Sequence, residues 1–158
     1  NVFVQMDTYA VKGLQTGQIQ FLYAPTHLNP TYEYGVTFER GTAVTYGDRK
    51  QIFISGTASI DNQGEIMYPG DILKQTERML ENIDTLLQEA GGGLQDIMQA
   101  IVYLRDPADY VVVKQYIESR YPSFLHLIVH APVCRPGWLI ETECIAVIPA
   151  DAPQYAYL

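Results

Sequence analysis

Cysteine, histidine and positive charge are all scarce in this sequence. It contains two cysteines, three histidines and ten lysines and arginines against 18 acidic residues, which gives a net charge of −8. Cys134 and Cys144 match no metal-binding spacing and the histidines are scattered, so we expect no metal and no cofactor. The acidic balance argues against a broad phosphate-binding surface, and we therefore expect no nucleic-acid partner.

Long apolar runs are also missing. No stretch of about 18 apolar residues occurs, so the sequence predicts no membrane span and no membrane partner. The first residues lack the charged-then-apolar pattern of a signal segment. The low cysteine content fits a reducing compartment, and together these features predict a cytoplasmic protein.

Enough apolar sequence is present for one folded domain. The 158 residues are 47% hydrophobic and 18% charged, which is typical of globular proteins. We expect a domain at residues 38–150, an N-terminal extension at 1–37 and a C-terminal tail at 151–158. The chain starts at Asn1 rather than Met, and residues 26–35 are loop-like. The extension is therefore interpreted as the remnant of an upstream module, with a processed chain as the alternative.

The central part of the chain shows clear strand and helix patterns. Residues 2–5 and 18–24 have strand character, and 42–46 and 51–60 predict two strands joined by a turn. A second turn is expected at 61–64, followed by a short strand. Asp71 is a good helix N-cap before apolar residues at helical spacing, and the glycines at 91–93 end that helix.

The second half of the chain predicts a strand, a helix and two more strands. Residues 98–104 form the strand, and Asp106 followed by Pro107 begins a helix that Pro122 ends. Residues 125–131 and 138–148 flank a Pro/Gly turn, which predicts an antiparallel hairpin. The order indicates an α+β fold in which both helices cover one face of a mixed sheet.

The predicted strand at 138–148 is apolar on both sides. One face carries Trp138 and Cys144, which we expect to be core residues. The other carries Glu141 and Glu143 among Leu, Ile and Val. Helices can cover only one side of such a sheet, and an exposed apolar face is costly. We therefore predict a closed oligomer with ligand clefts between subunits.

Several segments together resemble the RidA/YjgF family. They are ISGTASID, the helix segment QTERMLENIDTLLQEAGG with Gln75 and Asn82, then IVYLRDPADY, YIESRYP and IETECIAV, within residues 38–149. The family is also known as L-PSP endoribonucleases or translation initiation inhibitors. The resemblance implies a chorismate-mutase-like fold and a homotrimer with three ligand clefts between subunits. Deaminases of this family hold a substrate carboxylate with an arginine, and His126 stands at that position.

A second resemblance is to the RidA-like C-terminal half of chorismatases, which hydrolyse chorismate. It lies in FERG, SGTASI and CRPGWLIE. That group has a Cys-x6-Glu pairing at its site, which Cys134 and Glu141 reproduce in spacing. Arg40 falls near the place where the deaminases have a site tyrosine, and would bind an acidic ligand.

The site candidates each have a plain structural alternative. Glu141 is predicted as the catalytic acid, because a carboxyl in an apolar cleft has a raised pKa; the alternative is a paired edge carboxylate. Arg40 and Arg135 are predicted to bind a substrate carboxylate, or else to be solvated. Cys134 lines the cleft or is a turn residue. His126 is expected near Glu141 across the hairpin, or as an interface histidine.

Three functions remain open from the sequence. The first is a trimer that binds a small anionic metabolite, with hydrolase or deaminase chemistry at Glu141. The second is a chorismatase-like hydrolase. The third is a non-catalytic ligand-sensing module, or a translation inhibitor or endoribonuclease, although the acidic balance disfavours contact with RNA.

Overall fold

A single six-stranded sheet organises the part of the chain that the structure describes, residues 6 and 8–157 of a computed structural model. The strand order is β1-β2-β3-β6-β4-β5. β4 and β5 are parallel, and the other neighbours are antiparallel. The strands are β1 (Ile19–Leu22), β2 (Gly41–Thr45), β3 (Arg49–Ala58), β4 (Ile97–Leu104), β5 (His126–His130) and β6 (Ile140–Pro149).

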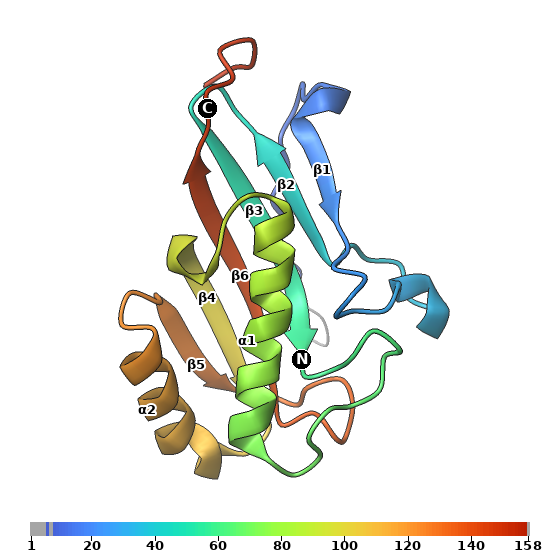
Figure 1. Ribbon diagram of the computed structural model, residues 1–158, viewed down its shortest axis with the longest axis vertical. Coiled ribbons are helices and arrows are strands. Elements are labelled where there is room, and N and C mark those ends of the chain that lie inside the picture. The colour runs from blue at the N-terminus through green and yellow to red at the C-terminus, as the bar shows by residue number, and fades with distance from the viewer. Residues whose placement is uncertain (1–5, 7, 158) are drawn as a thin grey trace.

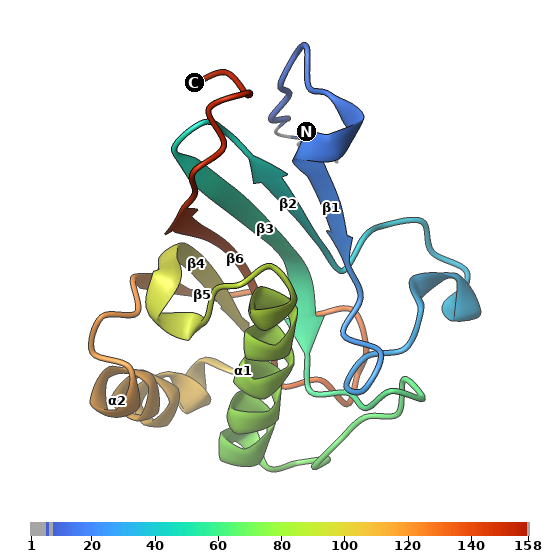
Figure 2. The same cartoon turned by 45° about the horizontal axis from the view of Figure 1, so that its top comes forward.

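Two helices cover one side of this sheet (Figures 1 and 2). α1 (Ile72–Glu89) starts at Asp71, whose side chain accepts a hydrogen bond from the Lys74 N–H at 3.0 Å. α2 (Tyr110–Arg120) follows a short 3-10 helix that Asp106 caps. Other 3-10 turns lie at Thr16–Gln18, Thr31–Tyr34 and Leu94–Asp96. The predicted α+β class, with both helices on one face of a mixed sheet, is confirmed.

The N-terminal part of the chain contributes to the same sheet. β1 lies before residue 38 and pairs with β2, which confirms the strand expected there. The strand predicted at residues 2–5 lies outside the described residues. The turn at 61–64 is also confirmed, because the Asp61 carboxylate accepts two backbone N–H groups and Gly64 has a φ of 78°. The segment after it makes only an isolated bridge, between Ile60 and Ile66.

The expected C-terminal hairpin is wrong. β5 pairs with β4 in parallel, and β6 lies between β3 and β4 rather than beside β5. The crossover through α2 brings β5 back parallel to β4 at the sheet edge. β6, which is apolar on both faces, takes a central place where both of its edges are paired. Residues 131–139 are therefore a loop between strands that are not neighbours.

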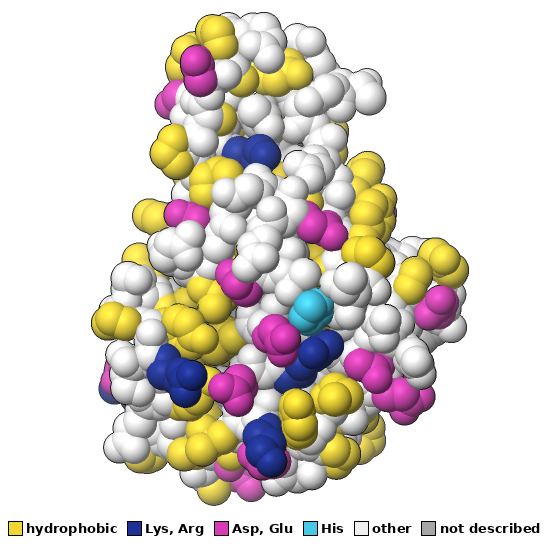
Figure 3. Space-filling view, viewed as in Figure 1, with side chains coloured by type: hydrophobic (Ala, Val, Ile, Leu, Met, Phe, Trp, Pro, Cys, Tyr) yellow, Lys and Arg dark blue, Asp and Glu magenta, His cyan; other side chains and the backbone are white. Residues whose placement is uncertain are grey.

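The core lies between the helices and the sheet. Buried side chains of α1, such as Leu80 and Leu87, are packed in one cluster with Ile52, Val102 and Cys144 of the strands. Cys144 is therefore a core residue as predicted, and burial raises its thiol pKa to about 12. On the outer surface of the helices, basic side chains are interspersed among acidic ones rather than gathered in a stripe (Figure 3).

Within the described part of the chain, no helix lies over the opposite side of the sheet (Figure 2). Along β6, the side chains of Glu141, Glu143 and Ile145 are half-buried while the intervening ones are buried. Leu127 on β5 is 68% exposed on the same side as its register partner Ile101. We call this surface the open face. Its apolar exposed residues agree with the sequence expectation that helices leave one side uncovered.

Candidate functional site

Glu141 lies on the open face near one end of the central strand β6. Its register partners are Ala58 on β3 and Tyr103 on β4. Side chains alternate along a strand, so Glu141 and Glu143 point to the same side, away from the core residues Ile140 and Thr142. The two carboxylates that stood out in the sequence therefore share the uncovered face.

Gly56 makes room for the Glu141 carboxylate. The register of β3 against β6 shifts between Ile54 and Thr57, and Gly56 lies within that irregularity. A Cβ at position 56 would collide with Oε1 of Glu141. A glycine inside a strand often marks a bulge or a close approach, and here it marks both.

The surroundings of Glu141 favour its protonated form. Burial raises its pKa above the usual carboxyl range, and the nearby charge of Glu143 raises it further. A hydrogen bond from the backbone of Cys134 acts in the opposite direction and lowers the pKa. A carboxyl whose pKa is raised is suited to give a proton to a substrate and to take one back.

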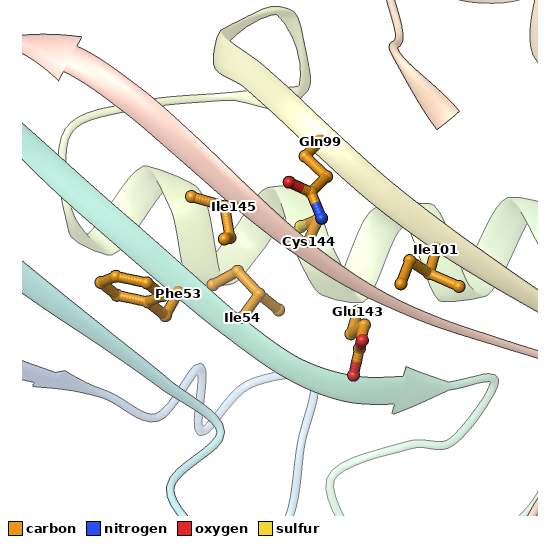
Figure 4. A pocket seen from close by; sticks show the side chains of 7 residues that line it. All are labelled: Phe53, Ile54, Gln99, Ile101, Glu143, Cys144 and Ile145. Carbon is orange, nitrogen blue, oxygen red and sulfur yellow. The ribbon is translucent and has the colours of Figure 1, made fainter. Parts of the chain in front are cut away.

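Glu143 is bound to a tyrosine on the neighbouring strand. The Tyr103 hydroxyl donates to Oε1 of Glu143 at 3.0 Å. Burial, then this bond and the charge of Glu143, raise the pKa of Tyr103 to about 12, so the phenol stays protonated. Glu143 also lines a hollow of about 210 Å³ between β3, β6 and β4, with Phe53, Gln99 and Ile145 among the walls (Figure 4).

The loop at 131–139 brings Cys134 and Arg135 to the same end of β6. The backbone of Cys134 lies near enough to Glu141 to lower its pKa, while the Cys134 side chain is exposed. Arg135 donates from Nη1 to the Gly64 carbonyl at 3.0 Å, and its guanidinium lies 5.1 Å from the Trp138 ring centre. The structure therefore brings Cys134 and Glu141 together, with Arg135 next to them in the chain.

Arg40 occupies a different setting. Its side chain is 5% exposed, and Nε and Nη2 donate to the Asn29 carbonyl at 3.2 and 2.9 Å. Arg40 lines a separate cavity of about 450 Å³ with Tyr23 and Tyr32. The backbone carbonyl of Arg40 accepts the N–H of Ser55, which is the residue before Gly56.

His126 lies on the other side of the sheet from Glu141. Its register partner is Ala100, which is buried on the helix-covered side opposite Cys144. The imidazole Nδ1 donates to the Phe124 carbonyl at 2.8 Å. A hairpin would have put the side chains of His126 and Glu141 on the same face of the sheet. That expectation does not apply, because β5 is not paired with β6. A substrate-binding role for His126 stays a prediction, and the structure does not place it beside Glu141.

The motif residues Gln75 and Asn82 hold backbone rather than line a cleft. Gln75 accepts the Leu139 N–H at 2.9 Å and donates to the Gly137 carbonyl at 3.0 Å. Asn82 donates to the carbonyls at 58 and 60, both at 3.0 Å. Both side chains are fully buried. They fix the two backbone segments that flank Glu141.

Sequence reasoning missed two residues of this site: Gly56 and Tyr103. A glycine in the middle of an apolar strand was the available signal for Gly56. Tyr103 lies on the same face of β4 as Ile101, but its relation to Glu141 depends on the strand order. Periodicity alone does not give that order.

The described residues contain neither a candidate metal cluster nor a helix that could span a membrane. Among residues 6 and 8–157, no group of three or more His, Cys, Asp or Glu side chains could hold a metal ion. Over the same part of the chain, neither helix has the length and apolar character that crossing a bilayer requires.

Comparisons with known proteins place this fold and site in context. The family model described as endoribonuclease L-PSP matches residues 41–148. The 3-aminoacrylate deaminase RutC of Acinetobacter baylyi is 31% identical over 97 residues, which cover 60% of this chain and 77% of that protein. A RutC family protein of Pyrococcus abyssi is 35% identical over 97 residues, covering 60% and 76%.

Solved structures show the same fold. RidA from the Antarctic bacterium Psychrobacter sp. superposes with a TM-score of 0.67 at 24% identity, covering 82% of this chain and 99% of that one. TdcF of E. coli, solved with bound serine, superposes with a TM-score of 0.66 at 21% identity, covering 82% and 98%.

Proposed function

The chain belongs to the endoribonuclease L-PSP (RidA/YjgF) family, and on that premise we propose that it binds a small carboxylate metabolite beside Glu141 and hydrolyses an electron-rich double bond in it. The observation that carries this proposal is the Glu141 carboxyl itself. It is half-buried over Gly56 and has a pKa raised by burial. A carboxyl of this kind is suited to proton transfer at carbon or nitrogen.

The favoured reaction is hydrolysis of an enamine. Protonated Glu141 gives its proton to the terminal carbon of the double bond, which leaves an iminium ion. Water adds to the iminium carbon, and the Glu141 carboxylate takes the proton that the water loses. The carbinolamine moves its hydroxyl proton to nitrogen and expels ammonia, which leaves a carbonyl. Support comes from the relative named 3-aminoacrylate deaminase, since 3-aminoacrylate is an enamine that carries a carboxylate.

Arg135 is the proposed partner of the substrate carboxylate. It follows Cys134 in the loop at 131–139, and a guanidinium can bind a carboxylate through two parallel hydrogen bonds. Arg40 is the second proposed carboxylate binder, in the separate cavity that its guanidinium lines beside Asn29. The relative solved with bound serine supports a ligand of amino-acid size and charge.

A chorismatase-like hydrolysis is the second candidate. The observation that favours it is that the Cys134 backbone lies near enough to Glu141 to lower its pKa, so the two residues of the Cys-x6-Glu spacing are neighbours. An enol ether is protonated at carbon as an enamine is, and water then adds to the oxocarbenium carbon with loss of an alcohol. The same acid would therefore serve both reactions.

We also propose that the protein is a homotrimer whose subunits meet through the open face, with the ligand in the clefts between them. The support is the apolar open face around Phe53, Ile101 and Leu127, which no helix covers. A cytoplasmic location and the absence of a cofactor stay predictions.

The test is a substrate panel with matched variants. Wild type, Glu141→Gln and Glu143→Gln are assayed on an enamine or imine acid generated in situ and on chorismate. We expect Glu141→Gln to lose about 100-fold or more in kcat, in line with loss of a general acid. Glu143→Gln should retain turnover, because it keeps the acid. The Glu143 charge raises the pKa of Glu141, so that pKa should fall in Glu143→Gln. The limb of the pH–rate profile that reports Glu141 should then move to lower pH.

The alternatives give different results in the same assay. Equal loss in both variants would mean that the acid is not specifically Glu141. A ligand that binds without turnover in wild type would overturn the enzymatic proposal and favour the ligand-sensing module.

A further inference from the structure

Residues 23–40 form a long loop that joins β1 to β2. Its two ends meet, because Leu22 is paired with Gly41 in the sheet. The structure describes this loop throughout, and apart from the 3-10 turn at Thr31–Tyr34 it contains no helix or strand. In Figure 1 the loop lies beyond the ends of β1 and β2, far from α2. Connections longer than roughly 12–15 residues are uncommon in compact domains and often carry function.

Side-chain hydrogen bonds hold the loop in one shape. The Glu89 carboxylate at the end of α1 accepts the N–H groups of Tyr23 and Ala24, both at 2.8 Å. Ala24 has a φ of 46°, in the left-handed region that residues with a side chain rarely adopt. The Thr31 hydroxyl donates to the Phe38 carbonyl at 2.9 Å. The loop is therefore ordered by its own contacts, and it keeps an unfavourable backbone conformation at Ala24.

This loop encloses a cavity of about 450 Å³, more than twice the volume of the hollow beside Glu143. Its walls include Tyr23 and Tyr32, which are exposed at its rim, together with Pro25 and Pro30. We call it the loop cavity. The volume is in the range of small-molecule sites, and its aromatic and proline walls suit a flat apolar group.

Arg40 gives the loop cavity a buried positive charge. Its Nε and Nη2 donate to the Asn29 carbonyl, and Nη2 also donates to Asn29 Oδ1 at 3.0 Å. Its guanidinium lies 5.4 Å from the centre of the Phe38 ring. Asn29 is itself buried and donates to Glu33 at 3.3 Å. The guanidinium is thus held in place before a ligand arrives, and a charge in a buried wall attracts an anion more strongly than one in open water.

The loop cavity is separate from the matched family domain. The family model matches residues 41–148, whereas the described lining residues of the loop cavity lie between 23 and 40. Glu141 and Gly56 lie within the matched residues. The loop cavity is therefore formed by a segment that this chain carries in addition to the family domain.

We propose that the loop cavity is a second ligand site, which binds a small aromatic carboxylate. The ring packs against Tyr23, Tyr32 and the prolines, and the carboxylate lies toward the Arg40 guanidinium. The exposed Glu39 also lines the cavity, so a ligand with one negative charge fits better than one with two. The proposal gives the ligand class for the separate cavity of Arg40 and does not depend on the reaction at Glu141.

The experiment is an amide NMR titration of the full chain with phenylacetate. We expect saturable shifts of the N–H signals of Asn29, Thr31 and Arg40. Phenylacetamide has the same ring without the charge, and butyrate has the charge without the ring. Each should bind about 10-fold more weakly than phenylacetate, because each lacks one of the two contacts.

Two variants separate the contributions of the ring and the charge. Tyr32 is 77% exposed, so Tyr32→Ala should leave the fold intact and weaken phenylacetate binding by about 3- to 10-fold. Tyr110→Ala, at a 43% exposed tyrosine of α2, is the matched control and should leave the affinity unchanged. Arg40→Gln should remove the preference for phenylacetate over phenylacetamide. If Arg40→Gln does not fold, Tyr32→Ala and the two analogues decide the result.

Three outcomes overturn the proposal: no shifts with phenylacetate, equal affinity for phenylacetamide, or shifts confined to the residues around Glu141. The affinity should be the same in Glu141→Gln as in wild type. The titration needs no turnover, so a protein without activity on the substrate panel would refute the proposed function and leave this test intact.

Discussion

At the scale of single residues, Glu141 lies among neighbours from other strands and from the loop that precedes β6. Gly56 comes from β3, Tyr103 from β4 and Cys134 from the preceding loop. The carboxylate was recognisable as unusual from its alternation with Leu, Ile and Val alone. Its partners were not, because the side chains that meet it depend on which strands lie beside β6.

The close approach of Gly56 to Glu141 gives a prediction at this scale. Gly56→Ala should destabilise the protein by about 1 kcal/mol, the low end of overpacking costs, because the new Cβ meets Oε1 of Glu141 and the carboxyl must shift. Chemical denaturation measures the change in the free energy of unfolding. In the Glu141→Ala background the same substitution should cost clearly less, since the colliding atoms are gone. Additive effects in this double-mutant cycle would show that the collision is relieved in another way.

At the scale of elements, α1 was the best defined by the sequence and β5 the least. The apolar stripe, the Asp71 cap and the glycines after the helix all agree on α1, and its bounds match the expectation. The strands at 125–131 and 138–148 were recognised as strands but paired wrongly. A Pro/Gly turn between two apolar runs is typical of a hairpin. Here the chain instead crosses over through α2, and β5 pairs in parallel with β4.

The cap of α1 gives the prediction at this scale. Asp71→Ala should lower the free energy of unfolding by about 1 kcal/mol, because the Lys74 N–H loses its acceptor. Asp71→Asn keeps a capping oxygen and is the matched control, with a smaller effect expected. Thermal and urea unfolding would measure both. An effect of Asp71→Asn as large as that of Asp71→Ala would assign the stabilisation to the negative charge rather than to the hydrogen bond.

At the scale of the whole molecule, the two sides of the sheet differ in what covers them. α1 and α2 cover one side (Figure 1). Leu127 and other apolar residues remain accessible on the open face. Exposed apolar area of this kind is a common mark of a subunit interface. The proposed trimer would bury it.

A charge on the open face is expected to break the assembly. Leu127 is 68% exposed, and Leu127→Asp should shift the protein from trimer to monomer, because the carboxylate would have to enter an apolar interface. Val111 on the outer surface of α2 is 60% exposed, and Val111→Asp is the matched control that should leave the trimer intact. Sedimentation velocity distinguishes the two states. A wild type that sediments as a monomer would contradict the proposed assembly itself.

The sequence by itself determined the α+β class, the two helices with their caps, the face assignment along β6 and the family resemblance. These follow from periodicity and from residues close together in the chain, and such patterns are local. Only the tertiary structure decided that β6 lies between β3 and β4, that His126 faces the helices, and that Arg105 and Gln75 hold the loop beside Glu141. Those relations join residues roughly 30 to 100 positions apart, and the contacts that select one strand order are made only when the whole sheet packs.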